Sequence, residues 1–173
     1  MHYGNIITSD VANGIGCRTS LFVSGCRNHC KNCFNPQTWD FNYGIEYTNE
    51  TKKFILNSLN KPYIDGLTIL GGEPMEPENQ SEVLDLITTI KSTMPNKTIW
   101  IYSGYLWEEM TGQIKSHILT NNTPNILKNI DVLVDGKFEQ DLYDIRLNYR
   151  GSSNQRIIDV KKSLNNKLTL IEL

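Results

Sequence analysis

The sequence predicts a single α/β domain with a mostly parallel sheet, and three observations support this. Short apolar stretches, rich in β-branched and aromatic residues, alternate with longer stretches of helical periodicity, which favours parallel strands joined by right-handed crossovers. Each predicted strand is followed by a polar segment that contains glycine. The chain of 173 residues can bury a core of its own, so residues 1–173 are expected to form one domain.

The first half of the chain holds two predicted strands with a helix between them. Thr19–Gly25 is a short run of β-branched and aromatic residues that ends in glycine, as expected of a buried strand. Residues 48–60 place apolar side chains between charged ones, which indicates a helix. The second strand, Gly66–Leu70, ends at the glycine pair Gly71-Gly72.

A longer helix is predicted next. Asn79 is a good N-cap residue, and Glu82 follows three residues later in the register of a capping box. Four apolar residues would then share one face of the helix: Val83, Ile87, Ile90 and Met94. Pro95 is expected to end it.

The second half of the chain continues the alternation. Thr98–Tyr102 and Ile130–Val134 are predicted strands, and a weaker helical segment at about 107–119 lies between them. The tail, Asn148–Leu173, is less regular, although RIIDV and KLTLIEL within it favour further short strands.

The polar segments after the four strands are expected to meet. They read SGCRNHC, GGEP, SGY and DGK in chain order. In parallel α/β sheets and barrels, ligands bind beyond the carboxyl ends of the strands. The sequence therefore predicts one site formed by all four segments.

Composition excludes several classes of function. The net charge is −2, and 39% of the residues are hydrophobic, so neither a nucleic-acid footprint nor a membrane surface is indicated. No signal peptide and no apolar run of membrane-spanning length is present, which predicts a cytoplasmic protein. Thiols stay reduced in the cytoplasm, so clustered cysteines there favour metal binding or catalysis over disulfides.

Three of the four cysteines form a C-x3-C-x2-C triplet: Cys26, Cys30 and Cys33. An ordinary iron–sulfur cluster is held by four thiolates. Three thiolates can instead hold three irons of a four-iron cube, which leaves the fourth iron open to a small molecule. The triplet therefore suggests a catalytic cluster. Cys17 stands apart and is expected to be a small packed residue.

Two other interpretations of the triplet remain open on spacing alone. A structural zinc site needs four ligands, and His29 is a possible fourth by residue type. One loop would then have to present four donors within eight residues, from Cys26 to Cys33. Three unliganded core cysteines are less favoured, because the residues between them are polar.

Five strings in the same order carry a family resemblance. TSLFVSGC-x3-C-x2-CFN-x2-TW, GGEP, YSGY, DVLVDGKF and RGSSNQRIIDV together cover about Asn13 to Val160. The triplet followed by GGEP resembles the radical S-adenosylmethionine (radical SAM) superfamily. The longer strings resemble, within it, the activating proteins of anaerobic (class III) ribonucleoside-triphosphate reductases.

The resemblance implies a partial (β/α) barrel of the radical SAM type and an oxidoreductase. The triplet cysteines would ligate a [4Fe-4S] cluster whose open iron binds S-adenosylmethionine. An electron passed through the cluster would cleave that cofactor into methionine and a 5′-deoxyadenosyl radical. The radical would then take a hydrogen atom from a glycine of the reductase, the protein substrate and partner. A reduced flavodoxin is the expected electron donor.

The resemblance also implies a set of cofactor-binding residues. These are Asn32, Cys33, Phe34, Gly71, Gly72, Glu73, Asp135 and Lys137. Gly71 and Gly72 would let backbone groups approach the methionyl amine, Phe34 would pack on the adenine, and Lys137 would face the cofactor's carboxylate. Without the resemblance, GGEP could be a plain turn and the Asp135–Lys137 segment a turn with solvated charges.

Several residues near the predicted site have two possible roles. Tyr102, Ser103 and Tyr105 could line an adenosine pocket or pack in the core. Arg27 and His29 could tune the cluster's potential or lie on a solvated loop. The segment Arg150–Arg156 could contact the partner or the cofactor.

Two alternative functions follow from the same motifs. The chain could activate another glycyl-radical enzyme, although many such activases carry extra cysteine quartets that this sequence lacks. It could also be a single-cluster iron–sulfur electron-transfer protein, for which four cysteine ligands would be usual.

Overall fold

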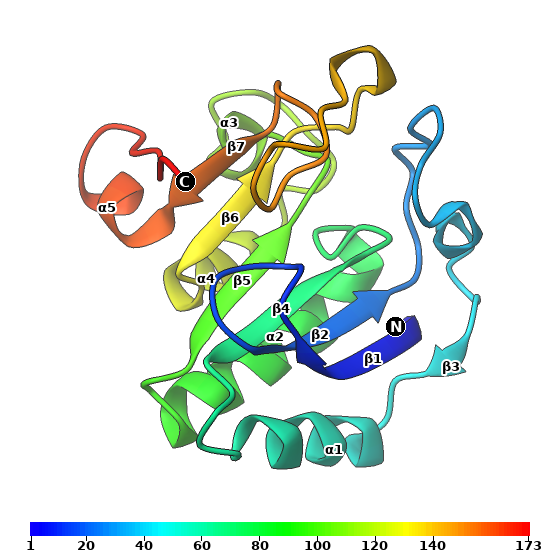
Figure 1. The fold of residues 1–173 in the computed structure, drawn as a ribbon, viewed down its shortest axis with the longest axis vertical. Helices are drawn as coiled ribbons and strands as arrows, with labels where there is room; N and C mark the ends of the chain where they lie inside the picture. The colour runs from blue at the N-terminus through cyan, green and yellow to red at the C-terminus, as the bar shows by residue number, and fades with distance from the viewer.

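A computed structural model describes residues 1–173 and contains one seven-stranded mixed sheet (Figure 1). The strand order is β3-β1-β2-β4-β5-β6-β7. The bounds are β1 (His2–Asp10), β2 (Arg18–Val23), β3 (Ile45–Glu46), β4 (Gly66–Gly71), β5 (Thr98–Tyr102), β6 (Val132–Asp135) and β7 (Arg156–Asp159). The central strands β2, β4, β5 and β6 are parallel, as predicted, and the outer pairs are antiparallel.

Five α-helices and two short 3-10 helices connect the strands. They are α1 (Asn49–Leu59), α2 (Pro77–Thr93), α3 (Trp107–Met110), α4 (Thr123–Asn129) and α5 (Val160–Asn165), with η1 (Pro36–Trp39) and η2 (Gln140–Leu142). None of the helices combines the length and apolarity needed to cross a bilayer.

The main core lies between the sheet and the helices on one of its faces. Successive strand residues point to opposite faces, so Ile99 and Ile101 of β5 join this core with Ile55 of α1 and Ile87 of α2. Figure 1 shows α2 and α4 behind the central strands. The other face of the sheet carries no such helical layer, and a smaller cluster around Trp100 forms there. Because no helices cover that face, it can carry a binding site.

The start of α2 differs from the prediction. The helix begins at Pro77 after the N-cap Glu76, so Asn79 is not the N-cap. Proline is favoured in the first helical turn, because its missing N–H would have no partner there, and it outweighs the capping-box pattern. Asn79 is instead 1% exposed, and its side-chain amide donates to the carbonyls of Ser24 (2.9 Å) and Glu73 (3.0 Å).

Other differences concern the helices after β5, the first strands and the C-terminal tail. The predicted helix at about 107–119 is only the single turn α3, and α4 was not predicted although Thr123-Pro124 resembles a helix start. The edge strand β3 and its neighbour β1 were also missed. RIIDV forms the predicted strand β7, whereas KLTLIEL makes only an isolated bridge, between Leu170 and Ile158.

Candidate iron–sulfur and cofactor site

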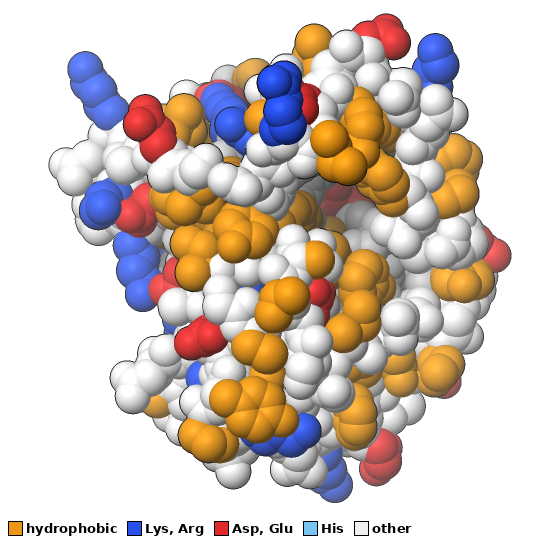
Figure 2. Space-filling model, viewed as in Figure 1, with side chains coloured by type: hydrophobic (Ala, Val, Ile, Leu, Met, Phe, Trp, Pro, Cys, Tyr) orange, Lys and Arg blue, Asp and Glu red, His pale blue; other side chains and the backbone are white.

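A cavity of about 610 Å³ lies at the carboxyl ends of the parallel strands. Its lining includes residues from all four segments predicted to meet: the triplet cysteines after β2, Gly71–Glu73 at the end of β4, Ser103-Gly104 after β5 and Gly136 after β6. Figure 2 shows the hollow with apolar side chains gathered around it. The predicted convergence is therefore confirmed.

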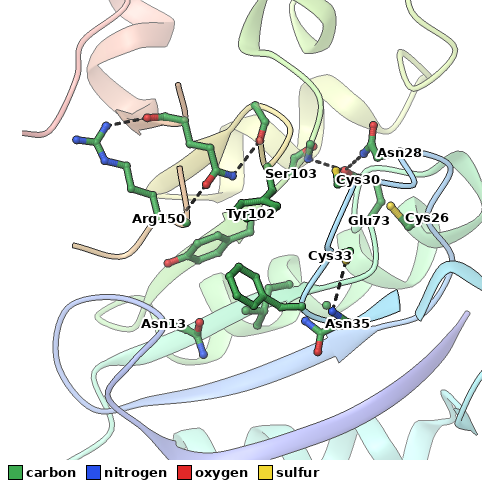
Figure 3. Close-up of a pocket in the computed structure, with 18 of the residues that line it drawn as sticks. Asn13, Cys26, Asn28, Cys30, Cys33, Asn35, Glu73, Tyr102, Ser103 and Arg150 are labelled. Carbon is green, nitrogen blue, oxygen red and sulfur yellow. Dashed lines mark hydrogen bonds between the residues drawn. The ribbon is translucent and has the colours of Figure 1, made fainter. Parts of the chain in front are cut away.

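The triplet cysteines all line this cavity (Figure 3). Their loop bends sharply at two residues with left-handed backbone, His29 (φ 47°) and Asn32 (φ 56°). The N–H of Cys33 donates to the carbonyl of Cys30 at 3.1 Å and closes a turn between them. These bends let three sulfurs from one short loop reach a common space.

Hydrogen-bond donors lie beside the sulfurs. The N–H of Asn35 donates to Sγ of Cys33 at 3.4 Å. Burial raises the pKa of the Cys30 thiol, and the backbone N–H of Phe138 opposes that rise. Burial, reinforced by the nearby Glu73 carboxylate, raises the pKa of Cys26 to about 12, so this thiol needs a strongly positive partner to lose its proton. Iron ions provide such a charge, and amide donors stabilise thiolate ligands.

The remaining candidate ligands are placed elsewhere. Cys17 packs beside the main core and does not line the cavity. His29, the candidate fourth zinc ligand, stacks on Trp39 with ring centroids 4.6 Å apart. No three His, Cys, Asp or Glu side chains are grouped closely enough to surround one metal ion. A four-iron cluster is wider than one ion, and a three-thiol donor set facing a cavity fits it.

The glycine pair fits tightly against the end of β2. Gly71 has a left-handed φ of 103°. A Cβ atom at Gly72 would lie 2.8 Å from the carbonyl oxygen of Gly25 and 2.9 Å from that of Thr38. Gly72 also donates its N–H to the carbonyl of Val23 at 2.7 Å. Both glycines line the cavity, so their backbone is presented to a ligand without side chains in between.

The Glu73 carboxylate is fully buried and connects three segments. It accepts hydrogen bonds from the N–H of Met75 (2.9 Å), the N–H of Gly104 (2.7 Å) and the side-chain amide of Asn28 (3.1 Å). Burial raises its pKa to about 7, against the effect of the Met75 and Gly104 donors. Glu73 thus lines the cavity while its carboxylate is already bound by protein groups.

Phe34 and Asn32 flank the third cysteine in different environments. Phe34 lines the cavity and is 66% exposed, and its ring packs against Phe138 with centroids 5.0 Å apart. Tyr143 completes a three-ring cluster with both. Asn32 is exposed and does not line the cavity.

Asp135 and Lys137 also lie in different environments, one buried and one exposed. Asp135 is fully buried and accepts from the N–H of Trp107 (2.7 Å) and from Nε of Arg156 (2.9 Å). It therefore fastens the end of β6 to α3 and β7. Lys137 is exposed, and only Gly136 between the two residues lines the cavity.

The segment Arg150–Arg156 closes the far side of the cavity, a role that sequence reasoning left undecided. The Gln155 side-chain amide donates to the carbonyl of Gly136 (2.9 Å), and its oxygen accepts from the N–H of Gly151 (2.8 Å). Arg150, Gly151 and Gln155 all line the cavity. Phe138, Tyr143 and Tyr149 were missed as lining residues, and the closeness of these aromatic residues in the sequence was the available signal.

Some of the polar groups in the cavity wall lack partners. Buried polar atoms of four lining residues make no hydrogen bond: Asn28 Oδ1, Trp39 Nε1, Tyr102 Oη and Arg150 Nε. Buried polar atoms ordinarily find a partner. In Figure 3, Tyr102 and Arg150 lie on the opposite side of the view from Cys26 and Cys30. The wall therefore has hydrogen-bonding capacity that the protein itself does not use.

Comparisons with known proteins agree on one family. A family model described as a 4Fe-4S single cluster domain matches residues 12–158. The anaerobic ribonucleoside-triphosphate reductase-activating protein of Enterobacteria phage T4 is 40% identical over 157 residues, which cover 91% of this chain and 93% of that protein. Proteins of the same name from Vibrio cholerae and Escherichia coli K12 are 42% and 39% identical, and the matches cover 97% and 96% of their lengths. This chain therefore belongs to the family of anaerobic ribonucleoside-triphosphate reductase-activating proteins.

Proposed function

We propose that this chain is a radical SAM enzyme that activates an anaerobic ribonucleoside-triphosphate reductase. When bound to the triplet cysteines, a [4Fe-4S] cluster would supply the electron that cleaves S-adenosylmethionine, and the resulting 5′-deoxyadenosyl radical would take a hydrogen atom from a glycine of the reductase. The observation that carries this proposal is the single cavity lined by three free thiols and the Gly71-Gly72 backbone.

The chain's own residues would bind and orient the reactants. The triplet cysteines would hold three irons, and the exposed backbone of Gly71 and Gly72 would receive the methionyl end of the cofactor. Phe34, beside the third cysteine and facing the cavity, would pack on the adenine. Lys137 would have to swing towards the cavity to reach the cofactor's carboxylate. The four parallel strands with their helices would correspond to the partial (β/α) barrel of the radical SAM type.

A protein substrate suits the position of the site. The cavity opens on the sheet face that carries no helical layer, and apolar side chains surround its mouth (Figure 2). A macromolecule that closed over this mouth would exclude water from the reacting atoms. The partner in the names of the relatives is the anaerobic ribonucleoside-triphosphate reductase. We propose the same partner here and a reduced flavodoxin as the electron donor.

The proposal is tested by anaerobic reconstitution with iron and sulfide, followed by reductant, S-adenosylmethionine and a candidate reductase. We expect methionine, 5′-deoxyadenosine and a glycyl radical doublet in the electron paramagnetic resonance spectrum. Cys30→Ala should abolish all three signals, and Cys17→Ala, outside the cavity, should leave them intact. A cluster that forms but does not cleave the cofactor would favour the electron-transfer alternative and refute the proposal.

A further inference from the structure

The first residues of the cysteine loop are held at consecutive positions by groups outside the loop. The N–H of Cys26 donates to the carbonyl of Trp39 at 3.2 Å. The next N–H, of Arg27, donates to a carboxylate oxygen of Glu76 at 2.9 Å. The side-chain amide of Asn28 then donates to Glu73. The conformation of the loop between the first two cysteines thus depends on contacts with the turn that precedes α2.

Glu76 makes the most extensive of these contacts. Its side chain is fully buried, and each carboxylate oxygen has two neighbours. Oε1 accepts from the N–H of Arg27 and from the hydroxyl of Tyr105 (3.2 Å). Oε2 lies 2.5 Å from the guanidinium of Arg27 and 3.2 Å from Nε2 of His117. One carboxylate therefore binds both the backbone and the side chain of the residue next to Cys26.

The Arg27 side chain is fixed on its other sides as well. Its guanidinium lies 4.5 Å from the centre of the Phe41 ring and also pairs with Glu78. The two ion pairs differ in exposure, because Glu76 is fully buried whereas the Glu78 side chain is 49% exposed. Exposed ion pairs contribute little, and buried charge-assisted bonds contribute more. Glu76 is thus the partner expected to determine where Arg27 and the adjoining Cys26 lie.

We propose that Glu76 is a positioning residue that holds Cys26 in its cluster-binding orientation through the backbone and side chain of Arg27. This inference rests on the proposed function, because it assumes a cluster on the triplet. Groups behind metal ligands commonly change metal affinity by about 10–100-fold when they are replaced. Glu76→Gln keeps the shape of the side chain but offers one acceptor oxygen in place of two. Its amide NH₂ would then face a donor, which should loosen the loop.

The test is the rate at which a chelator removes iron from the reconstituted protein, followed by the loss of cluster absorbance. We expect Glu76→Gln to lose iron about ten-fold faster than wild type. Arg27→Ala removes the ion pairs but keeps the backbone contact, so we expect a smaller increase of about three-fold, roughly the square root of the lower end of that range. Glu78→Gln, the matched control in the first turn of α2, should stay within about two-fold of wild type.

A second measurement separates positioning from general stability. The melting temperature of the iron-free protein is recorded for each variant, and a purely structural role would lower it without a specific effect on iron loss. Glu76→Gln that folds and loses iron at the wild-type rate would overturn the proposal. If Glu76→Gln fails to fold, an unchanged rate in Arg27→Ala overturns it instead. A wild-type protein that forms no cluster would refute the proposed function, an outcome distinct from both.

Discussion

Asn79 offers the sharpest test of the structure, because its position overturned a sequence-based expectation. Its buried side-chain amide donates to the carbonyls of Ser24 and Glu73, at 2.9 and 3.0 Å. Asn79→Ala would remove both bonds, each worth about 1 kcal/mol net. It would leave the Ser24 carbonyl without this donor, whereas the Glu73 carbonyl would keep its bond from the N–H of Glu76 at 3.2 Å. Alanine's better helix propensity would return up to about 0.7 kcal/mol. A net loss of about 2 kcal/mol should lower the melting temperature by roughly 4–8 °C for a domain of this size.

Asn79→Asp separates the observed role from the capping role. At an N-cap, aspartate replaces asparagine with little loss, because the side-chain oxygen does the capping. Here aspartate cannot donate and would place a buried charge against two carbonyls, so we expect a larger loss than for alanine. Scanning calorimetry of the iron-free variants measures both effects. Asn165→Ala, which removes one exposed bond to the carbonyl of Lys161, is the control and should stay near wild type. An Asn79→Asp melting temperature equal to wild type would refute this reasoning.

Three further predictions concern Gly72, the partly buried carboxylate of Asp131 and the cavity-lining ring of Phe34. Gly72→Ala should cost about 1–3 kcal/mol in urea denaturation, because its Cβ meets backbone carbonyls, whereas Gly4→Ala meets only a movable tyrosine ring and should cost less. Burial raises the pKa of Asp131, but bonds to Lys161 and Lys91 outweigh it and lower the pKa below 3.8. The stability that this carboxylate contributes is therefore complete above pH 3.8 and is lost as the pH falls through the lowered pKa. The free energies of unfolding of wild type and Asp131→Asn should accordingly converge only in acid. A constant difference between them down to about pH 2 would contradict this. Phe34→Ala should change the free energy of unfolding by less than about 1.5 kcal/mol, since the ring is 66% exposed. It should weaken the binding of S-adenosylmethionine to the cluster-loaded protein about ten-fold in calorimetric titration. An unchanged affinity would exclude the proposed adenine contact.

The parallel centre of the sheet could be predicted because its signals are local. Each of β2, β4, β5 and β6 is a short buried run followed by a glycine-containing segment, and that pattern also placed the site at the carboxyl ends. β1 was missed because its residues are only partly buried and its strand character comes from pairing with β2. Propensity carries little information about such a partly buried strand.

The cavity lining was predicted only in part, for a related reason. The triplet cysteines and the glycine pair are motifs whose chemistry is evident from residue type. The roles of Asp135, Glu73 and Asn79 depend instead on partners distant in the sequence, such as Arg156, Gly104 and Ser24. A carboxylate in a motif looks the same in the sequence whether it faces a ligand or fastens two loops. Only the tertiary contacts of these residues separate the two cases.

The two faces of the sheet divide stability from binding. On β5, Ile99 and Ile101 pack into the helical core, whereas Trp100 and Tyr102 point to the opposite face, where Tyr102 lines the cavity. The alternation of the strand sets this division, since neighbouring side chains cannot share a face. The core face is therefore filled mainly by apolar packing, and the other face can carry polar groups that lack protein partners. Tyr102, whose hydroxyl makes no hydrogen bond, is one such residue.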